Sequence, residues 1–187
     1  MMTARPKRSI IFVWDSGEEQ GLWGTRQFVA TPPVPLERIV AMINVDMIGA
    51  NRASGSPDAA DERVTGPNEV FLIGPGVLSD RANALAHQVN DAYLKLTLNR
   101  RYDTANSEFF YPRTDAGPYL ERGILTIGFT TGIHDRYHLP ADETRFLDAG
   151  KTAAITKTIL AIAHALAQAD QRPAIEKPVP ATVLKIR

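Results

Sequence analysis

The stretch Trp14-Asp15-Ser16-Gly17-Glu18-Glu19-Gln20-Gly21-Leu22-Trp23-Gly24 places two adjacent glutamates in a loop punctuated by glycines. An apolar, partly β-branched run precedes the loop and predicts a buried strand over residues 8–14. A helical pattern over residues 22–30 follows it. In α/β proteins the ends of strands carry the chemistry, and paired carboxylates there suit one metal ligand and one proton carrier. The order of strand, loop and helix therefore predicts a site at Glu18 and Glu19.

The remaining pattern alternates between strands and helices. Apolar runs predict further buried strands over residues 39–48, 70–74 and 124–130, and apolar residues at helical spacing predict helices over 79–96 and 145–168. This alternation predicts a three-layer α/β/α sandwich with a mostly parallel or mixed sheet. We expect one domain over residues 1–170, followed by a proline-rich C-terminal tail over residues 171–187.

The composition narrows the classes of partner and metal site. Twenty-one basic and twenty-one acidic residues give a formal charge of zero, so nothing favours nucleic acid or a membrane surface as a partner. Without cysteine, any metal must be held by His, Asp and Glu. The sequence contains no apolar run of transmembrane length, and the basic start over residues 1–8 lacks the apolar segment of a signal peptide.

Two further stretches hold candidate ligands. Asp46 interrupts the apolar strand predicted over residues 39–48, and a buried carboxylate needs a metal, an arginine or a helix end as its partner. Tyr137 and His138 lie in a polar loop after the strand predicted over residues 124–130. Glutamate, aspartate and histidine are ligands that zinc accepts in the absence of thiolates. Because each follows or ends a strand, these side chains are expected to converge from distant parts of the sequence.

Three stretches together resemble the M28 family of zinc peptidases, which includes bacterial aminopeptidases and related carboxypeptidases. They are Phe12-Val13-Trp14-Asp15-Ser16-Gly17-Glu18-Glu19-Gln20-Gly21-Leu22-Trp23-Gly24, Asn44-Val45-Asp46-Met47-Ile48-Gly49 and Phe129-Thr130-Thr131-Gly132-Ile133-His134-Asp135-Arg136-Tyr137-His138-Leu139-Pro140-Ala141-Asp142. The order, the spacing and the flanking residues all agree, from about residue 7 to about residue 165.

The resemblance implies a site with two zinc ions and a division of roles. Glu18 matches the general base that takes a proton from the metal-bridging water. Glu19 matches a ligand of one zinc, together with His138, and Asp46 matches a ligand of the other. Tyr137 matches the residue that hydrogen-bonds the tetrahedral intermediate. A non-coordinated carboxylate beside two cations and a phenol aimed at the developing oxyanion are physically suited to these roles.

The sequence departs from the family pattern upstream of the glutamates. The family also uses a histidine in a His-x-Asp motif and an aspartate that bridges both metals. The seventeen residues before Glu18 contain no histidine, and Asp15 is their only acidic residue. We therefore expect an N-terminally truncated catalytic domain, its C-terminal half, with partial or weak zinc occupancy.

A fourth stretch adds candidates for the substrate pocket. Arg113-Thr114-Asp115-Ala116-Gly117-Pro118 resembles the family's Arg-Ser-Asp-His segment, with Ala116 where a histidine is common. Arg113 and Asp115 are therefore expected to line the site that binds the substrate.

Three hypotheses of function follow. The first is a zinc-dependent exopeptidase, with aminopeptidase as its most specific form, that hydrolyses peptides through metal-activated water and a glutamate base. The second is a catalytically incomplete fragment or split-gene product, which a missing N-terminal half or another protomer would complete. The third is a glutaminyl-cyclase-like enzyme with a single zinc. The resemblance also suggests a secreted or periplasmic protein, although the 187 residues show no signal peptide.

Overall fold

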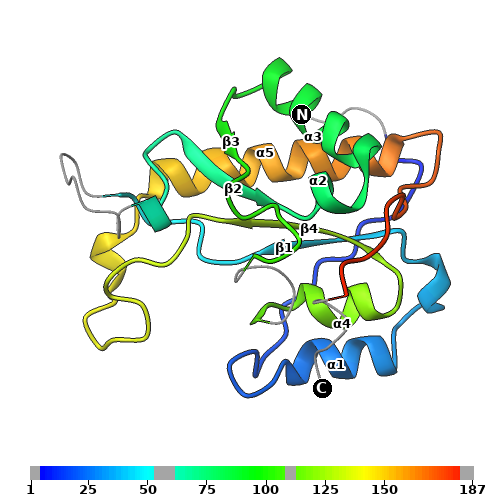
Figure 1. Ribbon diagram of the computed structural model, residues 1–187, viewed down its shortest axis with the longest axis horizontal. Helices are drawn as coiled ribbons and strands as arrows, with labels where there is room; N and C mark the ends of the chain where they lie inside the picture. The colour runs from blue at the N-terminus through cyan, green and yellow to red at the C-terminus, as the bar shows by residue number, and fades with distance from the viewer. Residues whose placement is uncertain (1–4, 53–61, 108–112, 182–187) are drawn as a thin grey trace.

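The computed structural model describes residues 5–52, 62–107 and 113–181, which form a mixed sheet with helices on both faces (Figure 1). The strands are β1 (Ala41–Val45), β2 (Glu69–Ile73), β3 (Thr97–Asn99) and β4 (Leu125–Thr130), in the spatial order β1-β4-β2-β3. Strand β1 is parallel to β4 and β2 is parallel to β3, whereas β2 and β4 are antiparallel. The prediction of a three-layer sandwich with a mixed sheet is confirmed.

Helices of unequal size cover the two faces of the sheet. On one side lie α2 (Pro75–Leu78), α3 (Asp80–Ala92) and α5 (Ala149–Gln168), and on the other lie α1 (Trp23–Ala30) and α4 (Ala116–Glu121) (Figure 1). Short 3-10 turns, η1 (Leu36–Arg38) and η4 (Thr144–Phe146), precede β1 and α5. The main core lies between β2, β4 and α5, where the apolar stripe of α5 is buried. Its members are Ile155, Ile159, Ile162 and Leu166.

The expected buried strand over residues 8–14 is wrong. Residues 9–17 adopt no regular secondary structure, and the side chains are exposed by 65% at Phe12 and 87% at Trp14. A strand requires a neighbour to accept its backbone hydrogen bonds. Strand β1 is the last of the sheet, and β4 is its only partner in the described part of the chain. The apolar sequence over residues 8–14 has the composition of a central strand. Among the described strands, it lacks the neighbours with which a central strand pairs.

The end of α3 also differs from the sequence expectation. The helix begins after Ser79, whose Oγ caps it by accepting a hydrogen bond from the Ala82 amide at 3.3 Å. It ends at Ala92, four residues before the predicted end at 96. The buried side chain of Asn90 accepts from the Leu96 amide at 2.9 Å and donates to the Leu96 carbonyl at 2.8 Å. These two bonds turn the chain so that it enters β3.

The C-terminal segment over residues 171–181 lies against the domain. The Glu176 carboxylate accepts hydrogen bonds from the Ser79 hydroxyl at 2.9 Å and from Arg81. Ile175 and Val179 pack against the main core. The boundary expected at residue 170 stays a prediction. Among the described helices, none combines the length and the apolar character required to cross a membrane.

Candidate active site

The loop that carries Glu18 and Glu19 is closed by its own backbone. The Glu18 carbonyl accepts hydrogen bonds from the Gly21 and Leu22 amides at 3.0 and 2.9 Å. Such a tight reversal requires left-handed backbone, and Gly17 and Gly21 supply it with φ of 73° and 105°. The chain enters α1 at Trp23, directly after this reversal. The two glutamates therefore occupy a short, internally bonded turn at the start of a helix.

Gly24 allows the incoming chain to lie against α1. A Cβ atom at this position would lie 2.5 Å from the Asp15 Cβ and 2.7 Å from the Ser16 amide nitrogen. The Gly24 amide instead donates to the Ser16 carbonyl at 2.8 Å. This close approach fixes where the chain leaves the extended segment and enters the glutamate loop.

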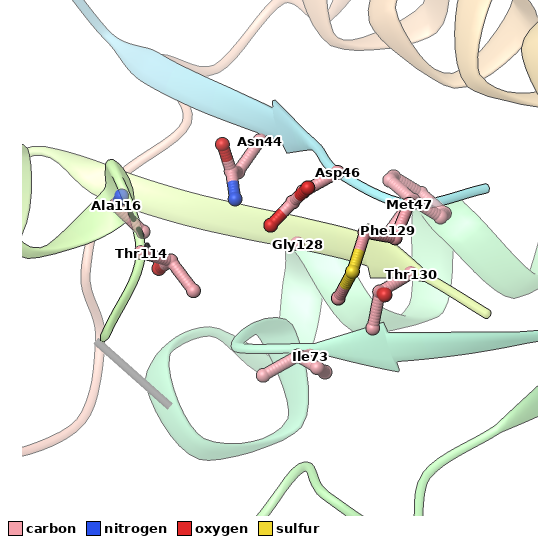
Figure 2. Close-up of a pocket in the computed structure, with 9 residues that line it drawn as sticks. All are labelled: Asn44, Asp46, Met47, Ile73, Thr114, Ala116, Gly128, Phe129 and Thr130. Atoms are coloured by element: carbon pink, nitrogen blue, oxygen red, sulfur yellow. Dashed lines mark hydrogen bonds between the residues drawn. The ribbon is translucent and has the colours of Figure 1, made fainter. Parts of the chain in front are cut away.

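Asp46 lies directly beyond β1, at the rim of a small cavity of about 40 Å³. Figure 2 shows Asn44 and Asp46, two positions apart, both pointing toward this cavity. The backbone turns sharply after Asp46, because Met47 has φ of 50°, and Thr131 holds the turn by donating its amide and hydroxyl to the Met47 carbonyl. The aspartate is therefore placed by the edge strand and by the loop that follows β4.

The loop after β4 brings His138 to Glu19 across 119 positions of sequence. The His138 Nε2 atom lies 2.5 Å from Glu19 Oε1, and both side chains are more than half exposed. The rings of Tyr137 and His138 stack with their centroids 3.7 Å apart. His138 adopts a left-handed backbone with φ of 60°, a conformation that is uncommon for a residue with a side chain. Strained positions of this kind cluster at functional sites.

The carboxylates of this region raise one another's pKa. Burial raises the pKa of Glu18, and the charges of nearby carboxylates add to it, whereas Arg113 acts in the opposite direction. The pKa of Asp46 is raised by burial and then by the charges of Asp115 and Glu19. The pKa of the Tyr137 phenol is raised by burial and then by the charges of Glu19, Glu18 and Asp46. The electrostatics thus link Glu18, Glu19, Asp46, Tyr137, Arg113 and Asp115 in one acidic region.

Sequence reasoning missed two residues beside this region, Asp15 and Thr25. The Thr25 hydroxyl, which is wholly buried, contacts Asp15 Oδ2 at 2.7 Å and also Asp115 Oδ1. Burial, followed by the charges of both aspartates, raises the pKa of Tyr119 to about 12. A signal for Thr25 was present, since it lies three positions after the apolar Leu22 and four before Val29, on the helix face that is buried.

The side chains at the site match part of a zinc shell. Glu19 and His138 are a carboxylate and an imidazole already in contact, and both are zinc ligand types. Asp46 is a partly buried carboxylate that forms no ion pair with any described residue. In the described ranges, however, no group of three or more His, Asp or Glu side chains is arranged to hold a metal ion. The donors present therefore fit the chemistry of zinc but fill only part of its usual four-coordinate shell.

Known proteins similar to this chain are peptidases. Residues 1–163 match the profile of Peptidase family M28. A Pyrenophora tritici-repentis protein described as "Probable zinc metalloprotease" is 27% identical over 149 residues, which cover 79% of this chain and 31% of that protein. The chain thus spans about a third of the length of this curated relative.

Solved aminopeptidases have a similar fold. The LapA aminopeptidase of Legionella pneumophila superposes with a TM-score of 0.67 at 20% identity, over 90% of this chain and 42% of that chain. The zinc aminopeptidase BSAP from Bacillus subtilis gives a TM-score of 0.58 at 17% identity, over 87% of this chain and 37% of that chain. At these identities the likeness establishes the fold alone. The matched region covers less than half of each aminopeptidase chain.

Proposed function

This chain belongs to peptidase family M28, and from that premise we propose that it is a zinc-dependent exopeptidase, most specifically an aminopeptidase. The observation that carries the proposal is the contact between Glu19 and His138, which joins two expected ligands of one zinc from opposite ends of the domain. Glu18 is the neighbour of Glu19 in the same turn, so a proton acceptor lies directly beside the metal ligand.

The metal would be held by residues of three separate segments. Glu19 and His138 would bind one zinc ion, and Asp46 would bind the other. Zinc would supply Lewis-acid polarisation of the scissile carbonyl and would acidify the attacking water. A cation at this position would also neutralise carboxylates that now raise one another's pKa.

Glu18 and Tyr137 would act on the substrate directly. The Glu18 carboxylate would accept a proton from the attacking water and deliver it to the leaving amine. Its raised pKa moves it toward the pH at which both transfers are efficient. The raised pKa of Tyr137 keeps its phenol protonated, so that the O–H can donate to the oxygen of the former carbonyl.

The test counts zinc and turnover on the same preparations. The chain is loaded with zinc, bound metal is measured, and hydrolysis of an amino-acid anilide is followed. We expect Glu18→Gln to retain zinc and to lose about 10²–10⁴-fold of the rate, as is usual for loss of a general base. Glu121→Gln, at the exposed end of α4, is the matched control and should keep the rate. Equal rates in the wild-type chain and Glu18→Gln would refute the proposed base.

A second candidate is a catalytic half that works only with another polypeptide. Two observations favour it. The described donors do not form a three-ligand group. In addition, the last strand of the sheet, β1, has one partner among the described strands, and a run of apolar side chains is exposed at Ile11, Phe12, Val13 and Trp14. A polypeptide that added a strand at this edge could bring the His-x-Asp and bridging aspartate ligands that the family resemblance implies.

Zinc titration of the chain alone separates the two candidates. An autonomous enzyme should bind zinc stoichiometrically and turn over the anilide. A catalytic half should bind zinc weakly, show no turnover at any zinc concentration, and gain turnover when an M28 segment bearing the missing ligands is added. A glutaminyl peptide assayed in parallel would reveal cyclisation, which would contradict both exopeptidase assignments.

A further inference from the structure

A buried hydroxyl stands between two carboxylates at the point where three segments meet. Thr25 lies on α1 and has no exposed surface. Its Oγ1 is 2.7 Å from Asp15 Oδ2, at the entry to the glutamate loop. The same Oγ1 contacts Asp115 Oδ1, at the start of α4. Asp115 occupies the N-cap position of α4, yet its side chain accepts no capping bond from that helix and is directed at Thr25 instead.

If both aspartates are ionised, these two contacts have only one hydrogen between them. A threonine hydroxyl carries one hydrogen, whereas an ionised carboxylate only accepts. One of the two oxygen–oxygen contacts would then lack a hydrogen and would bring lone pairs together. A protonated carboxyl can donate to the hydroxyl oxygen, which in turn donates to the other carboxylate. Two oxygen–oxygen hydrogen bonds thus require two hydrogens.

We propose that Asp15, Thr25 and Asp115 share one proton beyond the hydroxyl hydrogen of Thr25, and that this neutralised trio positions the glutamate loop against α4. The proton comes from solvent and is bound as the chain folds. In the bound arrangement the Asp115 carboxyl donates to Thr25 Oγ1, and the Thr25 hydroxyl donates to Asp15. Thr25 and Asp15 are therefore positioning residues, since they act on the site through Asp115 and through the loop.

The surroundings of Asp115 favour the protonated form. Burial raises its pKa, and the Asp15 charge raises it further, while the Thr25 hydrogen bond acts in the opposite direction. The other groups within electrostatic reach are the Glu18 and Asp46 carboxylates and the Tyr119 phenol, all of them acidic. Arg113, two positions away, is the cation whose charge reaches Glu18. A neutral Asp115 would therefore relieve the repulsion that Glu18 and Asp46 otherwise experience.

The shared proton can exist whether or not the chain is a peptidase. Its role in positioning the glutamate loop for catalysis rests on the proposed peptidase function. The test therefore uses the full chain without metal. Aspartate carboxyl carbons are labelled with ¹³C, and their protonation is followed by NMR from about pH 3 to pH 8, around the ordinary aspartate value. We expect one aspartate carboxyl other than Asp46 to titrate above the ordinary aspartate range, and we expect this titration to be lost in both Asp15→Asn and Asp115→Asn. Each amide supplies the second hydrogen itself, so the extra proton is no longer required.

Variants of Thr25 separate the hydroxyl from mere packing. Thr25→Ser keeps the hydroxyl and should keep the titration midpoint of that carboxyl, whereas Thr25→Val keeps the size and should shift the midpoint by about one pH unit. Asp91→Asn, on the exposed surface of α3, is the control that should change neither. The circular dichroism of each variant reports whether the fold is retained. The proposal would be overturned if no aspartate other than Asp46 titrated above the ordinary range in the wild-type chain, or if such a titration persisted in both asparagine variants.

Discussion

Lys151 and the carboxylates around Glu18 are charged groups removed from water in two different ways. Lys151 has hydrogen-bond partners for its charge, whereas the carboxylates lie close to charges of the same sign. The Lys151 side chain, whose residue is 5% exposed, donates from Nζ to the Ala50 carbonyl at 2.7 Å, the Thr65 hydroxyl at 2.8 Å and the Gly66 carbonyl at 2.8 Å. Burial lowers its pKa to about 8, so the amine is still largely protonated at neutral pH. This cation is fully hydrogen-bonded and ties α5 to the segments on both sides of residues 53–61.

In the acidic region around Glu18, two carboxylates lack partners of this kind among the described residues. Glu18 and Asp46 are partly buried, both have raised pKa values, and neither forms an ion pair with a described cation. The comparison teaches that a satisfied buried charge stabilises the fold, whereas a group of unsatisfied like charges costs stability and marks a place built to receive a ligand. Substitutions on each side of the comparison should therefore act in opposite directions.

Loss of the lysine should have the largest effect on stability. In Lys151→Met, the oxygens that accept from Nζ lose their donor inside the protein, and each unpaired buried group costs about 1–3 kcal/mol. We expect the free energy of unfolding in urea to fall by about 3 kcal/mol. Lys157→Met, on the exposed face of α5, is the matched control and should change it by less than about 0.5 kcal/mol. Similar losses in both variants would break the comparison.

Zinc should stabilise the chain through the acidic region. A ligand that binds only the folded state adds about 2.7 kcal/mol at a hundredfold excess over its dissociation constant. We expect thermal unfolding to shift upward with zinc in the wild-type chain and in His87→Ala, and this shift to be lost in His138→Ala. If His138→Ala kept the full shift, zinc would be binding elsewhere and the pairing of His138 with Glu19 would not be a ligand pair.

Removal of one acidic charge should stabilise the chain by a smaller amount. Because the folded pKa of Asp46 is raised, its protonated form stabilises the fold below the ordinary aspartate pKa, and this contribution is lost as the pH rises through the folded value. Without metal, Asp46→Asn should therefore match the wild-type chain near pH 3 and exceed it by about 1 kcal/mol near pH 7. Unfolding in urea at both pH values measures this, with Asp91→Asn as control. A destabilised Asp46→Asn at pH 7 would show that Asp46 already has a favourable partner.

Much of the sheet and its helices followed from hydrophobic periodicity, because β4 and α5 are buried by neighbours that lie within this sequence. Lys151 falls four positions before Ile155, on the stripe that the periodicity places in the core, so its burial was also readable. The end of α3 could not be predicted from the periodicity, because it depends on two hydrogen bonds made by the Asn90 side chain.

At the site, too, some features could be predicted from sequence motifs, whereas others depend on contacts between distant segments. The convergence of Glu19 with His138 was expected from the family motifs, and the structure places them in contact. The roles assigned to Glu18, Glu19, Asp46, Tyr137 and His138 stay predictions until they are tested. Periodicity marks Thr25 as buried, but its contact with Asp15 and Asp115 depends on the relative placement of three segments. Such placement is a property of packing and not of local sequence.

The outer edge of β1, which pairs with no other described strand, has a practical consequence for the laboratory. The backbone groups on this outer edge form a template on which further chains can add, and the exposed apolar side chains of Phe12 and Trp14 favour association as well. Concentrated preparations of this polypeptide are therefore expected to aggregate edge to edge rather than to unfold. Yield and solubility will be governed by this edge, and a charged substitution such as Val45→Lys, at the exposed end of β1, is the simplest way to blunt it.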